Sequence, residues 1–522
     1  MSATTATTEA RATRREWLGL VVLALPTLLL SVDISVLYLA LPHLSADLGA
    51  SSTEQLWILD IYSFMLAGFL VTMGTLGDRI GRRRLLLTGA AAFGATSVLA
   101  AYATSPEMLI VARALLGVSG ATLMPSTMAL IRNMFRDPKQ MAAAIGIWFA
   151  CFMGGMTLGP LVGGALLDNF WWGSAFLLGV PFMALLLVAG PVLLPEYRDT
   201  AAGRLDLTSV ALSLAAILPV IYGLKEIARN GWGTAPVLAV AAGVVAGVLF
   251  VRRQRRLTSP LLDVRLFANR SFRTALATML ATGIVMAGVT LMSTLYLQTV
   301  RGLSPLQAGL WLVPQNIAMA GGSMLAPALA RRLRPAYLMA VGLAVAGVGL
   351  LVQTQVGAAG GVGPLVTGLV LAGVGISPAM SLTMNLILGS APPEKAGSAA
   401  SISETSGEFG VALGVATLGS LATLVYRLRV PDAIPAGTPA RAADAARESI
   451  TAAVITAQHL PGTLGAGLLD AARTAFTTGL NTVAGVGAAV FLGLAILAAV
   501  AFRHLPSGMA AAAAEIPGQV SP

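Results

Sequence analysis

Long apolar runs recur along the whole chain, and no other feature of the sequence restricts its fold as strongly. A helix needs roughly 20 apolar residues to cross the hydrocarbon core of a bilayer. Only 11% of the residues are charged, whereas about 25% are charged in a soluble domain. An open sheet in lipid would leave backbone groups without hydrogen bonds, and the sequence lacks the alternating pattern of a barrel. The sequence therefore predicts an all-α, polytopic membrane protein.

Hydropathy divides the chain into fourteen transmembrane helices. These helices are expected near residues 17–39, 54–76, 85–104, 107–131, 140–167, 172–195, 205–227, 234–252, 271–298, 306–329, 337–356, 362–388, 395–425 and 476–503. Residues 1–16 are polar and basic, and the apolar run that follows them is long enough to span the membrane. We therefore expect that run to be retained as helix 1 rather than cleaved as a signal peptide.

Basic residues are unevenly distributed over this set of helices. With the N-terminus in the cytoplasm, 24 of the 33 Lys and Arg residues fall in cytoplasmic segments. Only Lys225, Arg229 and Arg301 fall in the short outer loops or at their margins. Because an excess of Lys and Arg marks cytoplasmic loops, we expect both termini in the cytoplasm of a bacterium and the helices in its inner membrane. The net charge of +10 then reflects this topology rather than nucleic-acid binding.

A short internal repeat indicates how the helices are grouped. The stretch Leu76–Gly89 after helix 2 recurs in degenerate form as Leu329–Gly342 after helix 10. Parallel repeats of this kind occur in transporters, whose substrate site lies between the two halves near the midplane. The chain is accordingly expected to divide into a cytoplasmic tail (1–16), an N-terminal six-helix bundle (17–200), two inserted helices (201–256), a C-terminal six-helix bundle (257–503) with an extracellular segment (427–475), and a cytoplasmic tail (504–522). That extracellular segment is either a partly helical flap or hairpin, or a disordered loop.

The loop after helix 2 carries a charged and glycine-rich motif. Its key residues are Gly74, Asp78, Arg79, Gly81 and Arg82. The motif resembles the GxLxDRxGRR loop of the major facilitator superfamily, which implies a role in conformational gating. Glycine permits a tight turn, the acid and the arginines can form an ion-paired network, and the basic face suits anionic lipid. The alternative is a basic stop signal at the membrane surface.

Helix 5 contains Gly155, Gly159, Pro160, Gly163 and Gly164. This pattern resembles the gxxxGPxxGG element of the superfamily's antiporters, in which small residues permit a close helix crossing and proline bends the helix. Glycine-rich packing without a transport role is the alternative reading.

Four further stretches resemble one family within this superfamily, the fourteen-helix drug:proton antiporters. They begin at Asp33 in helix 1, Gln55 in helix 2, Arg113 in helix 4 and Ser403 in helix 13, and the second and fourth are most similar to quaternary-ammonium and dye efflux pumps. The resemblance implies export of lipophilic cationic drugs, including quaternary ammonium compounds, dyes and fluoroquinolones, driven by a proton gradient without a bound cofactor. It also implies a proton-relay role for Arg113, although Leu116 stands where the family has glutamine.

Four acids lie inside predicted spans: Asp33, Asp60, Glu404 and Glu408. A charged side chain at the centre of a membrane helix costs about 2.5–3.5 kcal/mol on insertion scales, so each acid suggests a function. A proton and a cation compete for one buried negative charge, which is the minimum requirement for antiport. Our hypothesis is that Asp33 and one glutamate carry the exchanged protons, while Asp60 and the other glutamate attract the substrate cation. For each acid the alternative is a structural role or contact with water at a helix end.

Aromatic and thioether side chains suit flat lipophilic cations through cation–π and dispersion contacts. The candidates for a substrate cavity are Trp57, Tyr62, Trp148, Phe152 and Met319. The same helix as Met319 contains Gln315 and Asn316 where some relatives carry an acid, which would narrow the range of substrates. We expect a monomer in contact with membrane lipids, with small lipophilic cations and protons as its partners.

Other classes of function fit the sequence less well. An exporter of a neutral or anionic metabolite or natural product would need a positive or polar cavity, and Arg113 is the only basic residue predicted deep within a span. An enzyme would need a nucleophile–base set or metal-ligand spacing, and an ATP-driven pump would need a GxxxxGK[ST] loop; neither pattern occurs in the sequence. A channel is harder to distinguish, but the two-half repeat favours alternating access.

Overall fold

The computed structural model describes residues 12–198, 206–257, 264–389 and 396–502, and these residues are helical with no strand among them. The predicted tail 504–522, residues 1–11 of the predicted tail 1–16 and the predicted boundaries at 200, 201 and 257 require care. Of these, residues 1–11, 200, 201 and 504–522 lie outside the described residues, and residue 257 is the last one before a gap.

The described helices follow the chain in one alternating series. Their bounds are α1 (Arg14–Leu48), α2 (Ser52–Ile80), α3 (Arg82–Ala101), α4 (Pro106–Met134), α5 (Pro138–Asn169), α6 (Ser174–Leu177), α7 (Gly179–Leu193), α8 (Leu207–Asn230), α9 (Thr234–Arg256), η1 (Val264–Ala268), α10 (Arg270–Leu295), η2 (Tyr296–Val300), α11 (Pro305–Arg332), α12 (Pro335–Gln353), α13 (Gly363–Gly389), α14 (Ala396–Arg429), η4 (Pro431–Ala433), α15 (Ala440–Glu448), α16 (Ile450–Ala457) and α17 (Gly462–Ala501).

Local sequence sets several of these helix ends. Ser51 begins α2 with a capping box, in which its hydroxyl accepts from the backbone of Glu54 while the Glu54 carboxylate accepts from the backbone of Ser51. Ser304 and Gln307 form the same arrangement at the start of α11. Gly49 ends α1 with a φ of +67°, a conformation that glycine adopts without strain. The chain therefore turns back at these points for reasons that are local.

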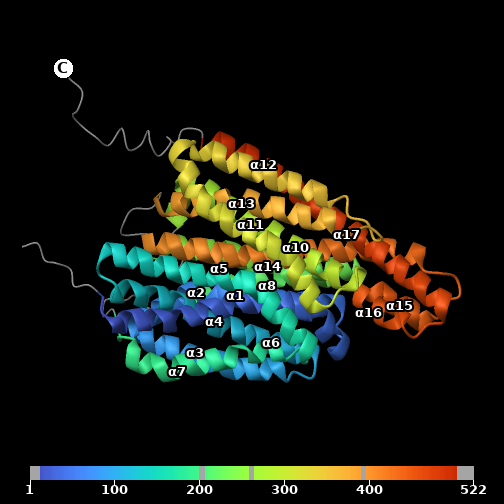
Figure 1. The fold of residues 1–522 in the computed structure, drawn as a ribbon, viewed down its shortest axis with the longest axis horizontal. Coiled ribbons are helices and arrows are strands. Elements are labelled where there is room, and N and C mark those ends of the chain that lie inside the picture. Colours follow the sequence, from blue (N-terminus) through green and yellow to red (C-terminus); the bar gives the residue numbers. More distant parts are fainter. Residues whose placement is uncertain (1–11, 199–205, 258–263, 390–395, 503–522) are drawn as a thin grey trace, which may run out of the picture.

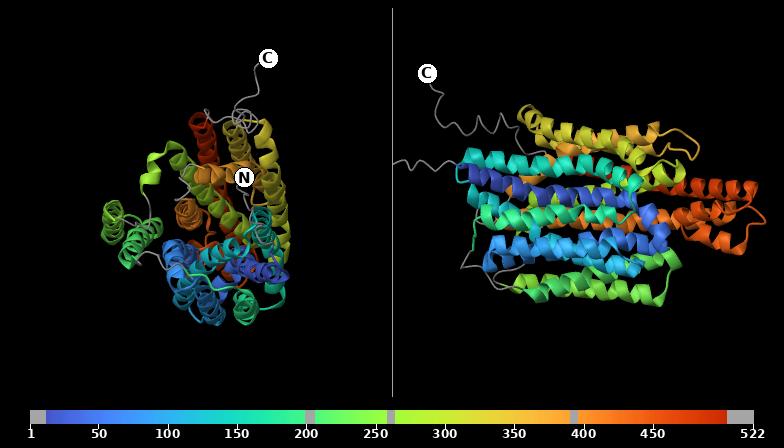
Figure 2. Two further views of the ribbon diagram at one scale, coloured as in Figure 1. Left: turned by 90° about the vertical axis from the view of Figure 1, so that its left-hand side faces the viewer. Right: turned by 60° about the horizontal axis from the view of Figure 1, so that its bottom comes forward.

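The long helices run side by side along one axis of the molecule (Figure 1). The start of α1 and the end of α17 lie at one end of this bundle, which we call the terminal end, while α15 and α16 lie at the opposite end, the hairpin end (Figures 1 and 2). Seen along the bundle, the helices of residues 12–198 and of residues 264–502 gather in two groups, with α8 and α9 to one side (Figure 2). The protein is an integral membrane protein by the length and apolarity of these helices.

The number of spans is smaller than the fourteen predicted from hydropathy. Among the described residues, twelve helices are long and apolar enough to cross a membrane, and a pair within α2 that is bent by 51° would make a thirteenth. The helix α11 is 28 residues long but is not among them. Polar residues such as Gln315 and Asn316 interrupt its apolar run, which lowers its mean hydropathy. The count of fourteen spans is therefore not confirmed.

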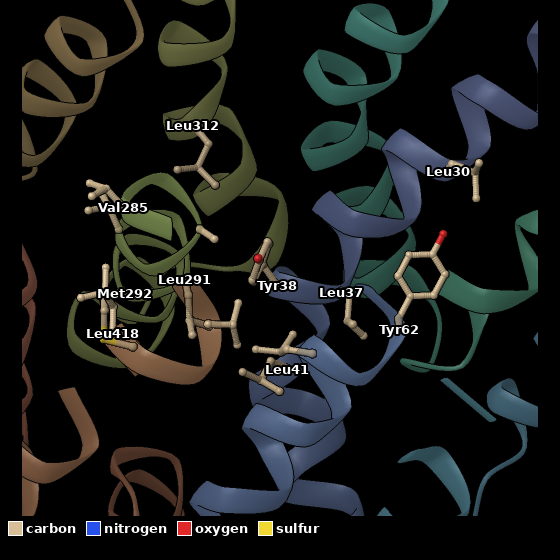
Figure 3. Close-up of a cluster of buried hydrophobic side chains, with 14 of the residues drawn as sticks. Leu30, Leu37, Tyr38, Leu41, Tyr62, Val285, Leu291, Met292, Leu312 and Leu418 are labelled. Atoms are coloured by element: carbon tan, nitrogen blue, oxygen red, sulfur yellow. The ribbon is translucent and has the colours of Figure 1, made fainter. Parts of the chain in front are cut away.

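Two pairs of helices join the two groups. α2 packs against α14, and α5 packs against α11. Near the hairpin end α1 also contacts α10, where Tyr38 and Leu41 of α1 lie close to Leu291 and Met292 of α10 (Figure 3). We call the α2–α14 and α5–α11 contacts the two seams of the molecule.

Segment 427–475 is largely helical. It comprises the end of α14, the short helices η4, α15 and α16, and the first turns of α17. The Glu448 carboxylate lies 2.6 Å from Arg427 of α14 and accepts hydrogen bonds from the backbone and hydroxyl of Ser52 on α2. This segment therefore covers the hairpin end of the α2–α14 seam.

Candidate functional site

Arg113 of α4 is buried between three other helices. Its guanidinium lies 2.8 Å from the Asp33 carboxylate of α1 and donates a second hydrogen bond, 3.2 Å long, to the backbone carbonyl of Ile58 on α2. The guanidinium carbon lies 4.5 Å from the centre of the Tyr62 ring, a cation–π contact. Only 1% of Arg113 is exposed. The structure thus brings together three residues that the sequence analysis had selected separately, and it gives Asp33 a counter-ion.

Asp60 of α2 is also paired with a buried base. The Nζ atom of Lys225 on α8 lies 2.7 Å from the Asp60 carboxylate and 4.0 Å from the centre of the Trp57 ring. Asp60 is 1% exposed and Lys225 is 2% exposed. Apart from this ion pair, neither the Asp60 oxygens nor the Lys225 ammonium has a hydrogen-bond partner among the described residues.

The position of Lys225 corrects the sequence analysis. We had placed Lys225 at the margin of a short outer loop and had taken Arg113 as the only base deep in a span. The structure places Lys225 inside the apolar span Leu207–Ile227. The hydropathy signal near the end of that span is weak because Lys225 and Glu226 are adjacent, which makes the segment look like a helix margin. The available signal was Asp60 itself, since a buried acid needs a counter-ion.

The two glutamates of α14 have a different environment. Glu404 and Glu408 are one helical turn apart and partly buried, and no ion pair to either is found among the described residues. One oxygen of Glu408 is buried without a hydrogen-bond partner, and Ser63 of α2 is a hydrogen-bond partner of its carboxyl group. Beside Glu408, Phe409 stacks edge-on against Phe64 of α2 at 6.0 Å. Glu408 therefore faces the α2–α14 seam.

Thioether groups gather near the other glutamate. The hydroxyl of Ser403, which precedes Glu404, lies 3.1 Å from the sulfur of Met279 on α10 and 3.4 Å from that of Met384 on α13. Neither methionine is among the five cavity candidates of the sequence analysis. Soft, polarisable side chains at this point would suit a lipophilic surface.

The five cavity candidates are distributed over both groups of helices. Trp57 and Tyr62 each contact a buried base, as described above. Trp148 and Phe152 follow each other by one turn on α5, and Met319 lies half-buried on α11, with its carbonyl accepting from Ser377 of α13. A small pocket at the hairpin end, lined by residues such as Leu41, Leu56 and Leu291, contains none of the five candidates and none of the four acids.

The glycines of the helix 5 element lie at two helix contacts. A Cβ atom on Gly155, Gly159 or Gly163 would come within 2.0, 2.8 or 2.6 Å of Ser31, Ser35 or Val36 of α1, respectively. A Cβ atom on Gly164 would lie 2.4 Å from the backbone of Leu306 on α11, and one on Gly309 of α11 would lie 2.3 Å from the carbonyl oxygen of Pro160. The element therefore packs one face on α1 and the other on α11, across the α5–α11 seam.

The loop between α2 and α3 is a compact charged turn. Gly81 has a φ of +113°, and a Cβ atom there would lie 2.5 Å from the carboxylate of Glu196. Asp78 pairs with Arg82 at 2.6 Å, and the carbonyl of Arg79 accepts from Arg198. Gly74 is less constrained, since its Cβ would lie 3.9 Å from Pro125. The turn thus joins α2 and α3 to the segment that follows α7.

These residues define a seam with four carboxyl groups, two of them neutralised by bases from the same chain. Such an arrangement can exchange a proton for a cation at a carboxyl group, which needs no metal. Among the described residues, no group of three His, Cys, Asp or Glu side chains is placed to hold a metal ion.

The fold and its buried charges are those of a membrane transporter. A bacterial homologue of the human lysosomal transporter Spinster, solved in an inward-facing and unoccupied conformation, superposes with a TM-score of 0.69 at 16% identity, over 94% of this chain and 98% of that one. The Major Facilitator Superfamily model matches residues 23–415. The chain belongs to the Major Facilitator Superfamily, and it is a transporter rather than an enzyme.

Its relatives are proteins of drug efflux and resistance. The chain is 43% identical to the multidrug efflux pump LfrA of Mycolicibacterium smegmatis, over 95% of this chain and 98% of that protein. It is 36% identical to the methyl viologen resistance protein SmvA of Salmonella typhimurium, over 88% of this chain and 93% of that protein. The resemblance that the motifs indicated is thereby confirmed, and with it multidrug efflux as the kind of transport.

Proposed function

We propose that this protein exports lipophilic cations across the bacterial inner membrane in exchange for protons. The observation that carries this proposal is the pair Glu404 and Glu408, which lies in the membrane-spanning part of α14 without a basic partner among the described residues. A buried carboxyl group without a counter-ion must take up either a proton or a cation from elsewhere. Methyl viologen, named in the description of SmvA, is a quaternary dication of the expected class.

The pairing of the other two acids supports a division of labour. Asp33 is held by Arg113, and Asp60 is held by Lys225, so each has a charge partner within the protein. We therefore assign proton and substrate exchange first to the glutamates, and regard Asp33 with Arg113 as the proton relay. This differs from the hypothesis drawn from sequence, in which Asp33 itself was one of the two proton carriers.

Alternating access would be a rocking of two six-helix bundles, residues 17–200 and 257–503, about the two seams. Every hydrogen bond between residues 12–198 and residues 264–502 in the described parts of the chain lies at the hairpin end or at mid-height, between Ser52 and Glu448, Asp168 and Ser304, and Met156 and Asn316. This distribution supports a state that is closed at the hairpin end. With both termini cytoplasmic, as proposed, that state would be open toward the cytoplasm.

Transport in proteoliposomes tests the proposal. An imposed pH gradient should drive uptake or release of ethidium by the wild-type protein, and Glu404→Gln and Glu408→Gln should each reduce gradient-driven flux by at least about tenfold, since each removes an exchangeable charge. Asp444→Asn is the matched control, because Asp444 is an exposed acid on α15. Its flux should equal that of the wild type.

Three results would count against the proposal in different ways. Flux that does not respond to the pH gradient would contradict proton coupling. Full flux in both glutamine variants would contradict the assignment of the glutamates. Absence of ethidium flux, with transport of neutral or anionic natural products instead, would favour the metabolite exporter considered from the sequence.

A further inference from the structure

The ion pair between Asp60 and Lys225 has an unusual composition for a buried lysine. An ammonium group has three N–H donors. Here it meets one carboxylate oxygen at 2.7 Å and the face of Trp57 at 4.0 Å, and no group in the described residues accepts from it with hydrogen-bond geometry. The surroundings thus supply a negative charge and an aromatic face but few acceptors.

This combination suits a cation that has no N–H groups. A quaternary ammonium or phosphonium ion is recognised by a carboxylate and by aromatic faces, and it needs no hydrogen-bond acceptor. Trp57 and Asp60 are three residues apart on α2, so they face the same way and could contact one such ion together. The ligand set around the lysine is therefore better matched to an organic cation than to the lysine itself.

The helix that carries Lys225 is loosely attached to the rest of the protein. α8 packs on α2 and α14, whereas α9 packs chiefly on α8. Only 22% of the apolar window of α8 and 11% of that of α9 is buried within the protein, compared with 56% for α10. Along α2, the contact runs through a small cluster that includes Phe64, Ile221 and Ala412. A shift of α8 or of its side chains would disturb few other contacts.

Lys225 also has a second position within reach. It lies five residues before the end of α8, and at 1.5 Å per residue its Cα is about 7.5 Å from that end along the helix axis. A lysine so close to a helix end can extend its side chain to the membrane surface, where water solvates the ammonium. Two arrangements are then available to it, one on Asp60 and one at the surface.

We infer that Trp57 and Asp60 form a binding subsite for quaternary organic cations, and that Lys225 is a tethered cation which occupies this subsite until a substrate displaces it. Lys225 neutralises Asp60 in the empty transporter and competes with every substrate that binds there. A substrate must exceed this competition, so weakly bound cations are rejected. The inference rests on the proposed function, because it assigns the first contact of the exported cation.

Binding of tetraphenylphosphonium to the purified, full-length protein in detergent tests the inference. The apparent affinity of a site is reduced by the fraction of molecules in which it is blocked. Lys225→Met removes the competitor and should tighten binding by about tenfold or more. Lys225→Arg keeps the charge and is the matched control, with affinity within about threefold of the wild type. The measurements are made at neutral and at alkaline pH, so that the vacated Asp60 is examined with its proton and without it.

Two further variants keep the test decisive if Lys225→Met does not fold. The exchange Asp60→Lys with Lys225→Asp retains the ion pair but moves the carboxylate to α8, and it should weaken binding by at least about tenfold, as should Trp57→Leu. Wild-type affinity in the exchanged protein would overturn the inference.

The failure of the inference can be told apart from that of the proposed function. If the wild type binds tetraphenylphosphonium but the folded Lys225→Met variant binds it no more tightly at either pH, the tethered-cation inference is wrong and cation export stands. If the wild type binds no organic cation at all, the proposed function is wrong as well.

Discussion

At the scale of single residues, Arg113 is the group on which most of the buried polar contacts of the N-terminal helices converge. It neutralises Asp33, satisfies the carbonyl of Ile58 and lies on the ring of Tyr62. Removing one partner of a buried ion pair is costly because the other charge remains in a low-dielectric surrounding. The contribution of Arg113 to stability should therefore depend on whether Asp33 is still charged.

We expect Arg113→Met to lower the free energy of unfolding by about 3–5 kcal/mol, because it leaves a buried carboxylate without its partner. Asp33→Asn should cost less, since the amide oxygen still accepts from the guanidinium. The double variant should cost less than the sum of the two single changes, with a coupling of about 0.5–3 kcal/mol. Thermal unfolding of the detergent-purified proteins measures all three. Strict additivity would show that the pair contributes no coupling.

Asp60 and Lys225 illustrate how far a sequence can identify such residues. The acid was recognisable because a carboxylate within an apolar run needs a reason to be there. Its partner was not, because Lys225 stands near the end of another apolar run and resembles an ordinary boundary lysine. Which base meets which acid depends on the packing of α8 on α2, and no local pattern in either helix encodes that contact.

At the scale of elements, α5 shows why neighbouring glycines are not equivalent. Gly155 lies against α1, where an added Cβ would be 2.0 Å from the hydroxyl of Ser31 and 2.7 Å from the carbonyl of Leu28. Gly154, the adjacent residue, has nothing within 4 Å of the same position. Both are helical, so backbone conformation does not distinguish them. Only the contact with α1 does.

This difference gives a controlled prediction. Gly155→Ala should destabilise the protein by about 1–3 kcal/mol, because the backbone of α1 cannot move away without disturbing its own packing. Gly154→Ala should be neutral or stabilising by up to about 1 kcal/mol, owing to the higher helix propensity of alanine. Unfolding temperatures of the two purified variants provide the measurement. Equal losses of stability in both would contradict the close α1–α5 contact.

The element that least resembles its sequence-based description is α11. Its helix is present, but polar residues within it keep it from being recognised as a span by apolarity. Asn316 donates to the carbonyl of Met156 on α5 across the seam, and a Cβ on Gly309 would meet Pro160. Such residues are tolerated in a membrane helix where they face another helix rather than lipid. Low hydropathy here accompanies a contact between the two groups of helices.

At the scale of the whole molecule, the two seams decide which end of the bundle is closed. The α5–α11 seam closes because Gly164 and Gly309 allow the two backbones to approach at the hairpin end. The α2–α14 seam is covered there by segment 427–475, through Glu448 and its contacts with Arg427 and Ser52. Loss of the close approach in one seam should shift the balance between conformations rather than unfold either group.

We therefore expect Gly309→Ala to separate the hairpin ends of α5 and α11 and to slow transport, since the added Cβ would lie 2.3 Å from the carbonyl oxygen of Pro160. Gly321→Ala, on the same helix, is the control, because nothing lies within 4 Å of its Cβ position. Spin labels on the two helix ends, in a background where the single cysteine Cys151 is replaced by serine, report the distance. Unchanged distances in Gly309→Ala would argue against a role of this contact in closure.

The apolar runs alone were sufficient for the class of the protein and for the approximate place of its helices, because a bilayer imposes the same length and apolarity on every span wherever it lies in the chain. The motifs around Gly81 and Gly159 and the acids at Asp33, Asp60, Glu404 and Glu408 were likewise recognisable locally. The partners of those acids were not. Asp33 meets a base on α4, Asp60 meets a base on the inserted helix α8, and the glutamates face a seam with α2. These pairings join helices far apart in the chain, and the energy of a buried charge depends on what surrounds it in space, which only the packing of the helices provides.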